Sequence, residues 1–322
     1  MNGDIRYSIV VPVYNEEAVI DQTYQRLKRV MDSTEESYEL IFVNDGSCDH
    51  TTARIKGFGD QDDAVKLITF SRNFGHQIAI TAGMDYASGA AVVVIDADLQ
   101  DPPELIPEMI AKWKEGYFVV YAKRTKRKGE TFFKKYTARL FYRILSISTD
   151  LQIPTDTGDF RLLDHRVCEE MKRLPEKNRY VRGLVSWVGF QQTAVEYERD
   201  ERFAGETKYP LKKMIKLSLD GLTSFSSKPL KMANYAGAFL IFSGLIYLAV
   251  LLHLKISTTS VNAGWNLVMA MQLLLTGILL TMMGIIGEYI GRIYDETRDR
   301  PLYIVSECYG LMKKERNVKK VV

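Results

Sequence analysis

The sequence predicts an α/β domain with a mostly parallel sheet, followed by interfacial helices and two transmembrane helices. Apolar, strand-like runs alternate with helical segments from residue 7 to residue 122. Two long stretches without Asp, Glu, Lys or Arg then occur near the C-terminal end. The strand-like runs are apolar almost throughout, which is typical of a parallel sheet covered by helices on both faces.

The elements of the first domain follow from local composition. Runs of β-branched and apolar residues predict strands, and apolar residues spaced three or four apart predict helices. Ligands of such a sheet bind beyond the carboxyl ends of its strands, so the residues after each strand are the candidates for function. The expected strands are 7–13, 38–43, 65–69, 91–95 and 118–121, and the expected helices are 17–31, 51–57, 77–86 and 103–115.

The most informative residues follow the fourth expected strand. Asp96 and Asp98 are two positions apart, and Gln100 is two further on. Carboxylate and amide oxygens suit Mg²⁺ or Mn²⁺, which would keep coordination sites for phosphate oxygens. The alternative is a polar strand-to-loop turn with Pro102 opening a helix. An EF-hand loop is excluded, because its sixth position requires glycine and Asp101 stands there.

The first two strand ends carry further polar residues. The turn after the first strand lacks the G-x-G-x-x-G pattern of a dehydrogenase-type dinucleotide fold. After the second strand, Asp45 is placed to accept hydrogen bonds from a base or ribose, and Gly46 permits a turn, although a plain turn has the same composition. Asp45, Asp96 and Asp98 are expected in one crevice, where repulsion requires a metal or hydrogen-bond donors. This favours a nucleotide-diphosphate–metal site.

Three later segments are basic or polar. Residues 123–143 mix Lys and Arg with aromatic residues, which suits a surface facing anionic head groups, or a solvated basic helix. Asp159 follows a glycine and precedes an aromatic residue and Arg161, with which it could form a structural salt bridge. The loop that contains Arg202 and Lys208 could close over a diphosphate or serve as a linker.

The C-terminal part predicts membrane attachment. Residues 211–231 form an amphipathic interfacial region, and residues 232–254 and 265–287 are each long enough to span a bilayer. Lys and Arg flank the pair of spans and are nearly absent between them, which places both termini in the cytoplasm. We therefore expect a multi-pass plasma-membrane protein without a secretory signal. Its expected parts are a catalytic domain 1–210, the interfacial region 211–231, a hairpin 232–287 and a cytosolic tail 288–322.

The remaining composition excludes several classes of protein. A net charge of +3 does not indicate nucleic-acid binding. Three cysteines, far apart and odd in number, indicate reduced thiols and no disulfide or zinc framework. The four histidines are scattered and predict no metal cluster.

Taken together, the chain resembles the polyisoprenyl-phosphate glycosyltransferases of glycosyltransferase family 2, bacterial relatives of dolichol-phosphate mannose and glucose synthases. The resemblance covers nearly the whole chain. The matching segments are Val10–Glu16, Val43–Ser47, Ser71–His76, Asp96–Glu104, Gly158–Leu162, Arg202–Tyr209 and Gly287–Tyr294.

The resemblance implies a GT-A fold and an inverting transfer of sugar from a nucleotide sugar, a UDP-hexose, to polyprenyl phosphate such as undecaprenyl phosphate. It implies Mg²⁺ or Mn²⁺ held by Asp98 and Gln100. Asp159 is implied to orient the acceptor or to take its residual proton. Arg124 and Arg139 are the candidates for the acceptor phosphate. The nucleotide sugar is implied to contact Pro12, Tyr14, Glu16, Asp45, Asp96, Ala97, Arg202 and Lys208.

The sequence also leads to expectations about the oligomeric state, the partner proteins and two alternative functions. The resemblance and the glycines of the spans favour a homo-oligomer, with a tetramer expected. A flippase and a downstream glycosyltransferase are expected to use the product. The alternatives are a processive polysaccharide synthase, which would need a Q-x-x-R-W segment and more spans, and a non-enzymatic nucleotide-sugar-binding adaptor, which would show a degraded Asp-x-Asp.

Overall fold

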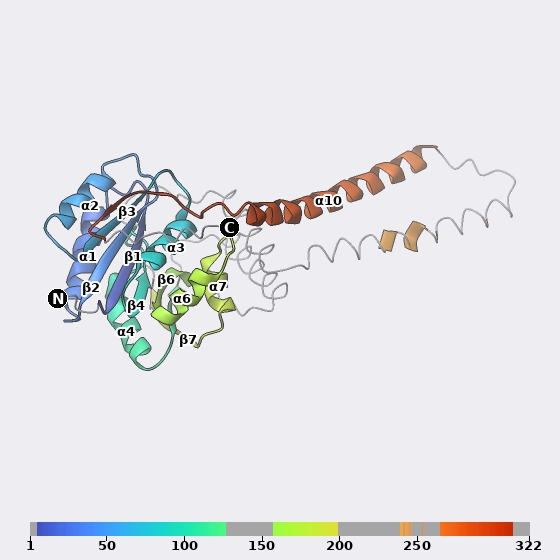
Figure 1. Ribbon diagram of the computed structural model, residues 1–322. Coiled ribbons are helices and arrows are strands. Elements are labelled where there is room, and N and C mark those ends of the chain that lie inside the picture. Colours follow the sequence, from blue (N-terminus) through green and yellow to red (C-terminus); the bar gives the residue numbers. More distant parts are fainter. Residues whose placement is uncertain are drawn as a thin grey trace, which may run out of the picture. The chain divides into compact units, whose positions relative to one another are not determined.

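The computed structural model describes residues 5–126, 157–198 and 265–311, with a few helical positions between 239 and 253 (Figure 1). The chain divides into two compact units, residues 1–216 together with 301–322, and residues 217–300. The expectations for the interfacial region 211–231, and for Arg139, Arg202 and Lys208, lie outside the described residues.

The first unit is built on a sheet in which the described residues form eight strands, in the order β7-β5-β6-β4-β1-β2-β3-β8 (Figure 1). Strands β3, β2, β1 and β4 are neighbours and run parallel, and β5 and β7 also pair in parallel. Strands β6 and β8 run in the opposite direction. The predicted mostly parallel α/β sheet is therefore confirmed. The strands are β1 Tyr7–Val13, β2 Tyr38–Asn44, β3 Val65–Phe70, β4 Ala91–Val94, β5 Val119–Lys126, β6 Thr157–Asp164, β7 Gln192–Glu198 and β8 Val305–Tyr309.

The register of the parallel strands brings their carboxyl ends to one edge. Tyr7 of β1 pairs with Tyr38 of β2 and with Ala91 of β4, so the three strands begin level with one another. At the other end Val13 pairs with Asn44. The loops after β1, β2 and β4 consequently leave the sheet at the same edge, as the sequence predicts.

Strand β6 was not among the strands expected from the sequence. All eight of its residues are buried, and it lies antiparallel between β4 and β5. Val94 pairs with Arg161, so the start of β6 lies beyond the end of β4. A reversed strand therefore delivers its first residues, including Asp159, to the carboxyl edge of the parallel strands.

Helices cover both faces of this sheet. The helices α1 Ile20–Asp32 and α2 Thr51–Gly59, with η1 Pro103–Leu105 and α4 Ile106–Lys114, contribute to a core on one face. The helices α3 His76–Tyr86 and α6 His165–Arg173 pack against strands and against each other, and α7 Val181–Trp187 follows them in the chain.

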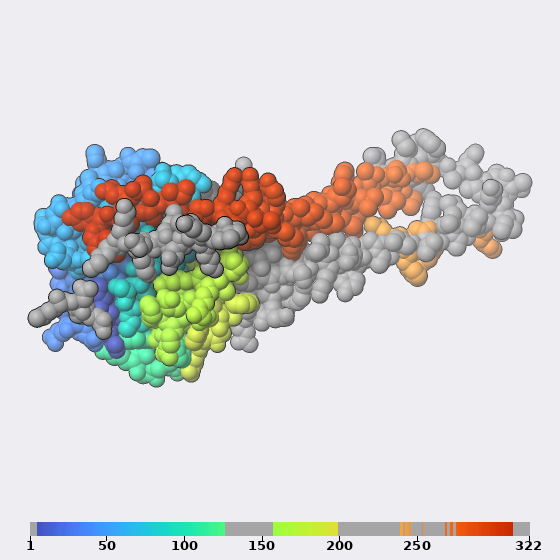
Figure 2. Space-filling model, in the orientation of Figure 1, coloured from blue at the N-terminus to red at the C-terminus, as the bar shows by residue number. Residues whose placement is uncertain are grey.

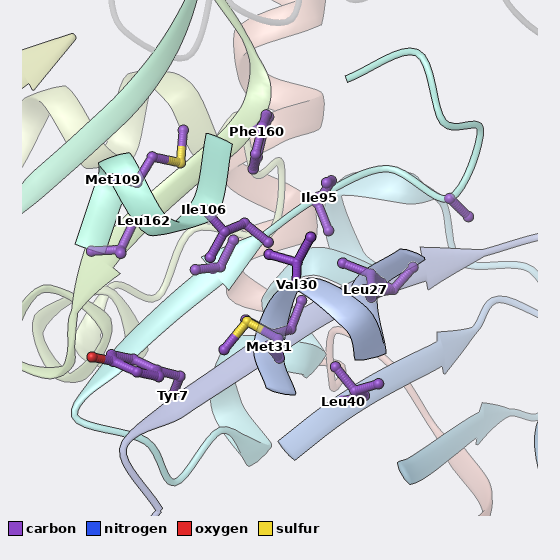
Figure 3. Close-up of a cluster of buried hydrophobic side chains, with 14 of the residues drawn as sticks. Tyr7, Leu27, Val30, Met31, Leu40, Ile95, Ile106, Met109, Phe160 and Leu162 are labelled. Atoms are coloured by element: carbon purple, nitrogen blue, oxygen red, sulfur yellow. The ribbon is translucent and has the colours of Figure 1, made fainter. Parts of the chain in front are cut away.

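The core on the first face joins side chains far apart in sequence. Figure 3 shows Leu27 and Met31 of α1 with Ile106, Met109 of α4 and Phe160 of β6. Complete burial of each such side chain stabilises the fold by about 1.5–3 kcal/mol. On the opposite face, a Cβ at Gly83 would lie 2.1 Å from Val10 Cγ1. Helix α3 therefore lies close to β1, and its position is fixed by packing.

The segment expected as a C-terminal tail, 288–322, contributes strand β8 to the first unit. Leu67 of β3 pairs with Tyr309 of β8. Lys56 of α2 forms an ion pair with Glu307, at 2.7 Å. In Figure 2 these C-terminal residues, in red, lie against the blue N-terminal part of the surface. The sheet is thus completed by residues that follow the second unit in the chain.

In the second unit, helix α10 runs from Trp265 to Thr297. The expected second span, 265–287, starts at the same residue, but the helix continues ten residues further. Its segment Leu275–Thr297 is long and apolar enough to cross a membrane, judged by length and composition. Within the described residues this is the single helix that meets that criterion. The expected first span, 232–254, is described at a few helical positions, so a second span is not shown.

Candidate functional site

The loops after β1 and β2 are tied to each other at the carboxyl edge. Asn15, with a left-handed φ of 52°, donates its backbone N–H to Ser47 Oγ and accepts from the Cys48 N–H. The Glu16 N–H donates to Thr51 Oγ1, at the start of α2. These bonds hold the expected nucleotide-sugar residues Tyr14 and Glu16 directly beyond β1, while Pro12 lies within the strand. Tyr14 is 39% exposed, and its contact with a nucleotide sugar stays a prediction.

Asp45 directly follows β2 and organises a neighbouring loop. Its carboxylate accepts hydrogen bonds from the backbone N–H groups of Phe74, at 2.6 Å, and Gly75, at 3.0 and 3.2 Å. Burial raises the pKa of Asp45, against the opposing effect of these donors. Gly46 beside it has a φ of 75°, and a Cβ there would lie 2.7 Å from the backbone of Arg72. Asp45 therefore anchors the loop before α3, and its contact with a nucleoside stays a prediction.

The Asp96–Gln100 segment forms a tight turn after β4. Leu99 has a left-handed φ of 58°, a conformation that is strained for a branched side chain. The Gln100 N–H donates to Asp98 Oδ1 at 3.2 Å. The buried Ala97 fixes the turn to α1, because its carbonyl accepts from Thr23 Oγ1 at 2.7 Å. The bond between positions 98 and 100 joins the Gln100 backbone to the Asp98 side chain, and the role of the two residues as metal ligands stays a prediction.

A divalent cation fits this donor set. Among the described residues no three His, Cys, Asp or Glu side chains are grouped to hold a metal on their own. Mg²⁺ typically binds through one or two carboxylates and completes its shell with substrate phosphates and water. Oδ1 of Asp96 is buried and accepts no hydrogen bond from the described part of the chain, and the His76 Nε2 atom lies 3.4 Å from it. The carboxylate of Asp98 and the amide oxygen of Gln100 are hard oxygen ligands of the kind that such a cation takes.

Asp96 and Asp159 meet across His76, the first residue of α3. The His76 Nε2 atom lies 3.4 Å from Asp96 Oδ1 and 3.3 Å from Asp159 Oδ2. Burial opposes the charging of His76, but the two carboxylates outweigh it and raise its pKa to about 9. Burial raises the pKa of Asp96 to about 6, with His76 acting against the shift. The imidazole is therefore a half-buried cation between two acidic side chains at the sheet edge.

Asp159 is held by three side chains. Besides His76, Arg182 Nε donates to Asp159 Oδ1 at 2.7 Å, and Gln77 Nε2 donates to Oδ2 at 3.1 Å. Although burial acts to raise it, Arg182 and His76 hold the pKa of Asp159 well below its usual range. The sequence suggested a salt bridge with Arg161, but that guanidinium donates to the Gly158 carbonyl at 3.0 Å. Asp159 forms its ion pairs with Arg182, on α7, and with His76.

The positive charge on His76 makes a contribution to the stability of the fold that depends on pH. Its folded-state pKa of about 9 exceeds the ordinary 6.5, so charged His76 stabilises the fold fully below pH 6.5. This contribution is lost as the pH rises through the folded-state pKa. We expect the Tm difference between wild type and His76→Gln to shrink between pH 6.5 and about 9.5, measured by thermal unfolding in detergent. A difference that stays constant over this range would contradict a charged His76.

Arg124 reaches the same edge from β5. Its Nε donates to Tyr197 Oη at 3.0 Å, and its Nη2 lies 3.5 Å from Asp101 Oδ2. Tyr197 Oη also donates to Asp101 Oδ1. A Cβ at Gly158 would lie 2.6 Å from Arg124 Nη2, so this glycine leaves room for the guanidinium beside the start of β6. The structure thus brings Arg124 to the site, whereas Arg139, Arg202 and Lys208 lie outside the described residues.

Several site residues were not identified from the sequence. His76 belongs to a segment that carries the family resemblance, but nothing in its spacing assigned it a contact. Arg182 lies in no recognisable pattern, and its partner is 23 positions away. Asp101, beyond β4, and Tyr197 of β7 are 96 positions apart, and Arg124 of β5, whose strand pairs with β7, contacts both. These contacts depend on strand pairing between distant segments.

Comparison with known proteins places these features in a family context. Residues 8–172 match the model of "Glycosyl transferase family 2". The chain is 68% identical to "Uncharacterized glycosyltransferase YkcC" of Bacillus subtilis (strain 168), covering 98% of this chain and 97% of that protein. It is 40% identical to "SfII prophage-derived bactoprenol glucosyl transferase" of Shigella flexneri, covering 95% and 99%. Glucosyl-3-phosphoglycerate synthase from Mycobacterium tuberculosis aligns with a TM-score of 0.46 at 19% identity, over 69% of this chain and 80% of that chain.

Proposed function

Because this chain belongs to glycosyl transferase family 2 and is a glycosyltransferase closely related to bactoprenol glucosyl transferases, we propose that it transfers a hexose from a nucleotide sugar to polyprenyl phosphate. One observation carries the proposal: 40% identity to a bactoprenol glucosyl transferase over 95% of the chain. We propose UDP-glucose or another UDP-hexose as donor and undecaprenyl phosphate as acceptor. Transfer is proposed to invert the anomeric centre.

The charge distribution of the site suits two anionic substrates. Asp96, Asp98 and Asp159 lie near one edge with the cations His76, Arg182 and Arg124. Such a site can hold a diphosphate and a phosphate close together only if positive charge offsets their repulsion. We assign the donor to the side of Tyr14, Glu16, Asp45 and Asp96, and the acceptor phosphate to the side of Arg124.

The turn after β4 is proposed to hold a divalent cation through Asp98 and Gln100. A bound Mg²⁺ or Mn²⁺ would neutralise charge that develops on the departing diphosphate. The chain's own task is to orient the donor. The tight turn at Leu99 keeps Asp98 and Gln100 in place, and Arg202 and Lys208 are proposed to close on the diphosphate.

Asp159 is proposed to orient the acceptor site and not to act as a general base. A phosphate monoester acceptor is largely ionised near neutral pH, so its attack needs little help from a base. Asp159 accepts from Arg182, Gln77 and His76, and its low pKa makes it a weak proton acceptor. Its ion pair with Arg182 instead holds a guanidinium at the edge where the acceptor phosphate would lie.

The direct test is a donor screen with the purified full-length protein. A short-chain polyprenyl phosphate would be incubated with Mg²⁺ and, in turn, UDP-glucose, UDP-galactose or UDP-N-acetylglucosamine. Mass spectrometry would detect a prenyl phosphate heavier by one sugar residue. Product with one donor supports the proposal and identifies the sugar. Binding of UDP without product from any donor would favour the adaptor alternative.

Membrane association is supported by helix α10, and the topology is proposed from charge. We propose a plasma-membrane hairpin with residues 256–264 outside and both termini in the cytoplasm. A Ser260→Cys variant without the native Cys48, Cys168 and Cys308 should then react with an impermeant thiol reagent in intact cells. The matched control is Ser47→Cys in the first unit, which should react only after lysis. Reversed labelling of the two variants would show the opposite orientation.

A further inference from the structure

The loop Ser71–Gly75 joins β3 to α3 and contributes to the candidate site through its last residues. Its Phe74 and Gly75 N–H groups donate to Asp45, and it leads directly into His76. Arg72 stacks over the Phe74 ring, with its guanidinium carbon 4.1 Å from the ring centroid. A small displacement of this loop would therefore move both His76 and the N–H groups that bind Asp45.

Residues near β8 contact the elements on either side of this loop. The Tyr303 ring stacks on Phe70, the last residue of β3, with centroids 5.1 Å apart and an interplanar angle of 21°. Tyr303 Oη donates to Asp85 Oδ2, in the last turn of α3, at 2.9 Å. Phe70 in turn packs edge-on against Phe74, at 5.6 Å.

The backbone of the same segment binds the start of the loop. The Ser71 N–H donates to the Ile304 carbonyl at 2.9 Å, where the β3–β8 register shifts between Thr69 and Phe70. The loop is thus held by Asp45 on the side of β2 and by residues 303–304 on the side of β8. These two residues follow α10 in the chain and lie outside every segment that suggested a site from sequence.

We infer that Tyr303 is a positioning residue for the donor side of the site: it holds β3 and α3 at a fixed separation, and so sets the loop that binds Asp45 and presents His76. An effect of Tyr303 on nucleotide-sugar binding rests on the proposed function, which assigns the donor to Asp45. The effect of Tyr303 on the position of the loop does not depend on that function. The C-terminal segment is then part of the catalytic apparatus, and removing it would disturb the donor site.

The chain supplies a matched control for this role. Tyr309, on β8 a few residues further along the chain, donates its hydroxyl to Asp60, which follows α2. Tyr303→Phe and Tyr309→Phe each remove one tyrosine–aspartate hydrogen bond from the same segment. They differ in whether the bond reaches α3. Tyr303→Ala additionally removes the stacking on Phe70.

The test is hydrogen exchange of the full-length protein, with peptides covering residues 71–75 and 305–309 followed by mass spectrometry. We expect exchange in 71–75 to accelerate about three- to tenfold in Tyr303→Phe and further in Tyr303→Ala, because one hydrogen bond or more is lost. Tyr309→Phe should leave 71–75 unchanged. Unchanged exchange in 71–75 for both Tyr303 variants would overturn the inference. So would equal acceleration in Tyr303→Phe and Tyr309→Phe, which would show general loosening of β8.

Titration with UDP and steady-state kinetics separate this inference from the proposed function. We expect Tyr303→Ala to raise the Kd for UDP and the KM for the nucleotide sugar, with a smaller change in kcat, and Tyr303→Phe to recover most of the affinity. Faster exchange in 71–75 with unchanged UDP affinity would overturn the link to the donor site. A wild-type protein that binds no UDP would instead refute the proposed function and leave the exchange result standing.

Discussion

Asp159→Asn is expected to retain UDP binding and to lower kcat on the order of a hundredfold. The substitution preserves the shape of the side chain but removes the charge that pairs with Arg182 and His76. Because Asp159 is buried and Arg182 is half-buried, we also expect a loss of about 2 kcal/mol in the free energy of unfolding. Steady-state kinetics with varied acceptor, isothermal titration with UDP and denaturant unfolding would measure the three effects.

A double-mutant cycle controls for simple destabilisation. If Asp159 acts through Arg182, the stability losses of Asp159→Asn and Arg182→Gln should fall short of additivity by about 0.5–3 kcal/mol. The exposed pair Arg173–Glu170 on α6 serves as a reference in which coupling should be small. Wild-type turnover in a folded Asp159→Asn protein would leave the residue a purely structural role. Loss of UDP affinity would place it on the donor side.

Asp98→Ala is expected to abolish metal-dependent turnover while the sheet remains intact. Asp98 lies on a turn beyond β4, and its backbone neighbours are held independently by the bond between Thr23 and Ala97. We expect kcat to fall on the order of a hundred- to a thousandfold, since an electrostatic contact to the departing diphosphate is lost. Activity would be measured across Mg²⁺ and Mn²⁺ concentrations, and Mn²⁺ binding in the presence of UDP by electron paramagnetic resonance.

Glu104→Gln provides the matched control on the same side of the sheet. Glu104 is an exposed carboxylate at η1 that pairs with Arg26 at 2.6 Å, outside the proposed ligand set. Its replacement should leave Mn²⁺ binding and turnover unchanged. Mn²⁺ binding of wild-type strength in Asp98→Ala would show that the cation does not bind at this turn. Full activity of Asp98→Ala in EDTA would contradict metal dependence itself.

Local sequence patterns determined the framework of the first unit. The β-branched and apolar runs 7–13, 38–43 and 91–95 predicted parallel strands, and the strands β1, β2 and β4 that form there pair in register at one edge of the sheet. The polar residues that follow these strands, from Tyr14 to Gln100, were therefore recognisable as rim residues by their position in the sequence. This succeeded because buried parallel strands are apolar along their whole length, and the pattern stops where the strand leaves the core.

The tertiary structure alone decided which charges meet at that rim. Strand β6 was not predicted, because Asp159 and Arg161 interrupt its apolar pattern, yet its insertion beside β4 places Asp159 against His76 and Asp96. Pairing between β3 and β8 likewise brings Tyr303 to Phe70 across more than 230 positions. Strand partners are chosen by side-chain packing and backbone hydrogen bonds between distant segments, and these leave no periodic signal in either segment. The sequence by itself thus determined the sheet edge and its acidic residues, whereas long-range pairing determined the cations that hold them.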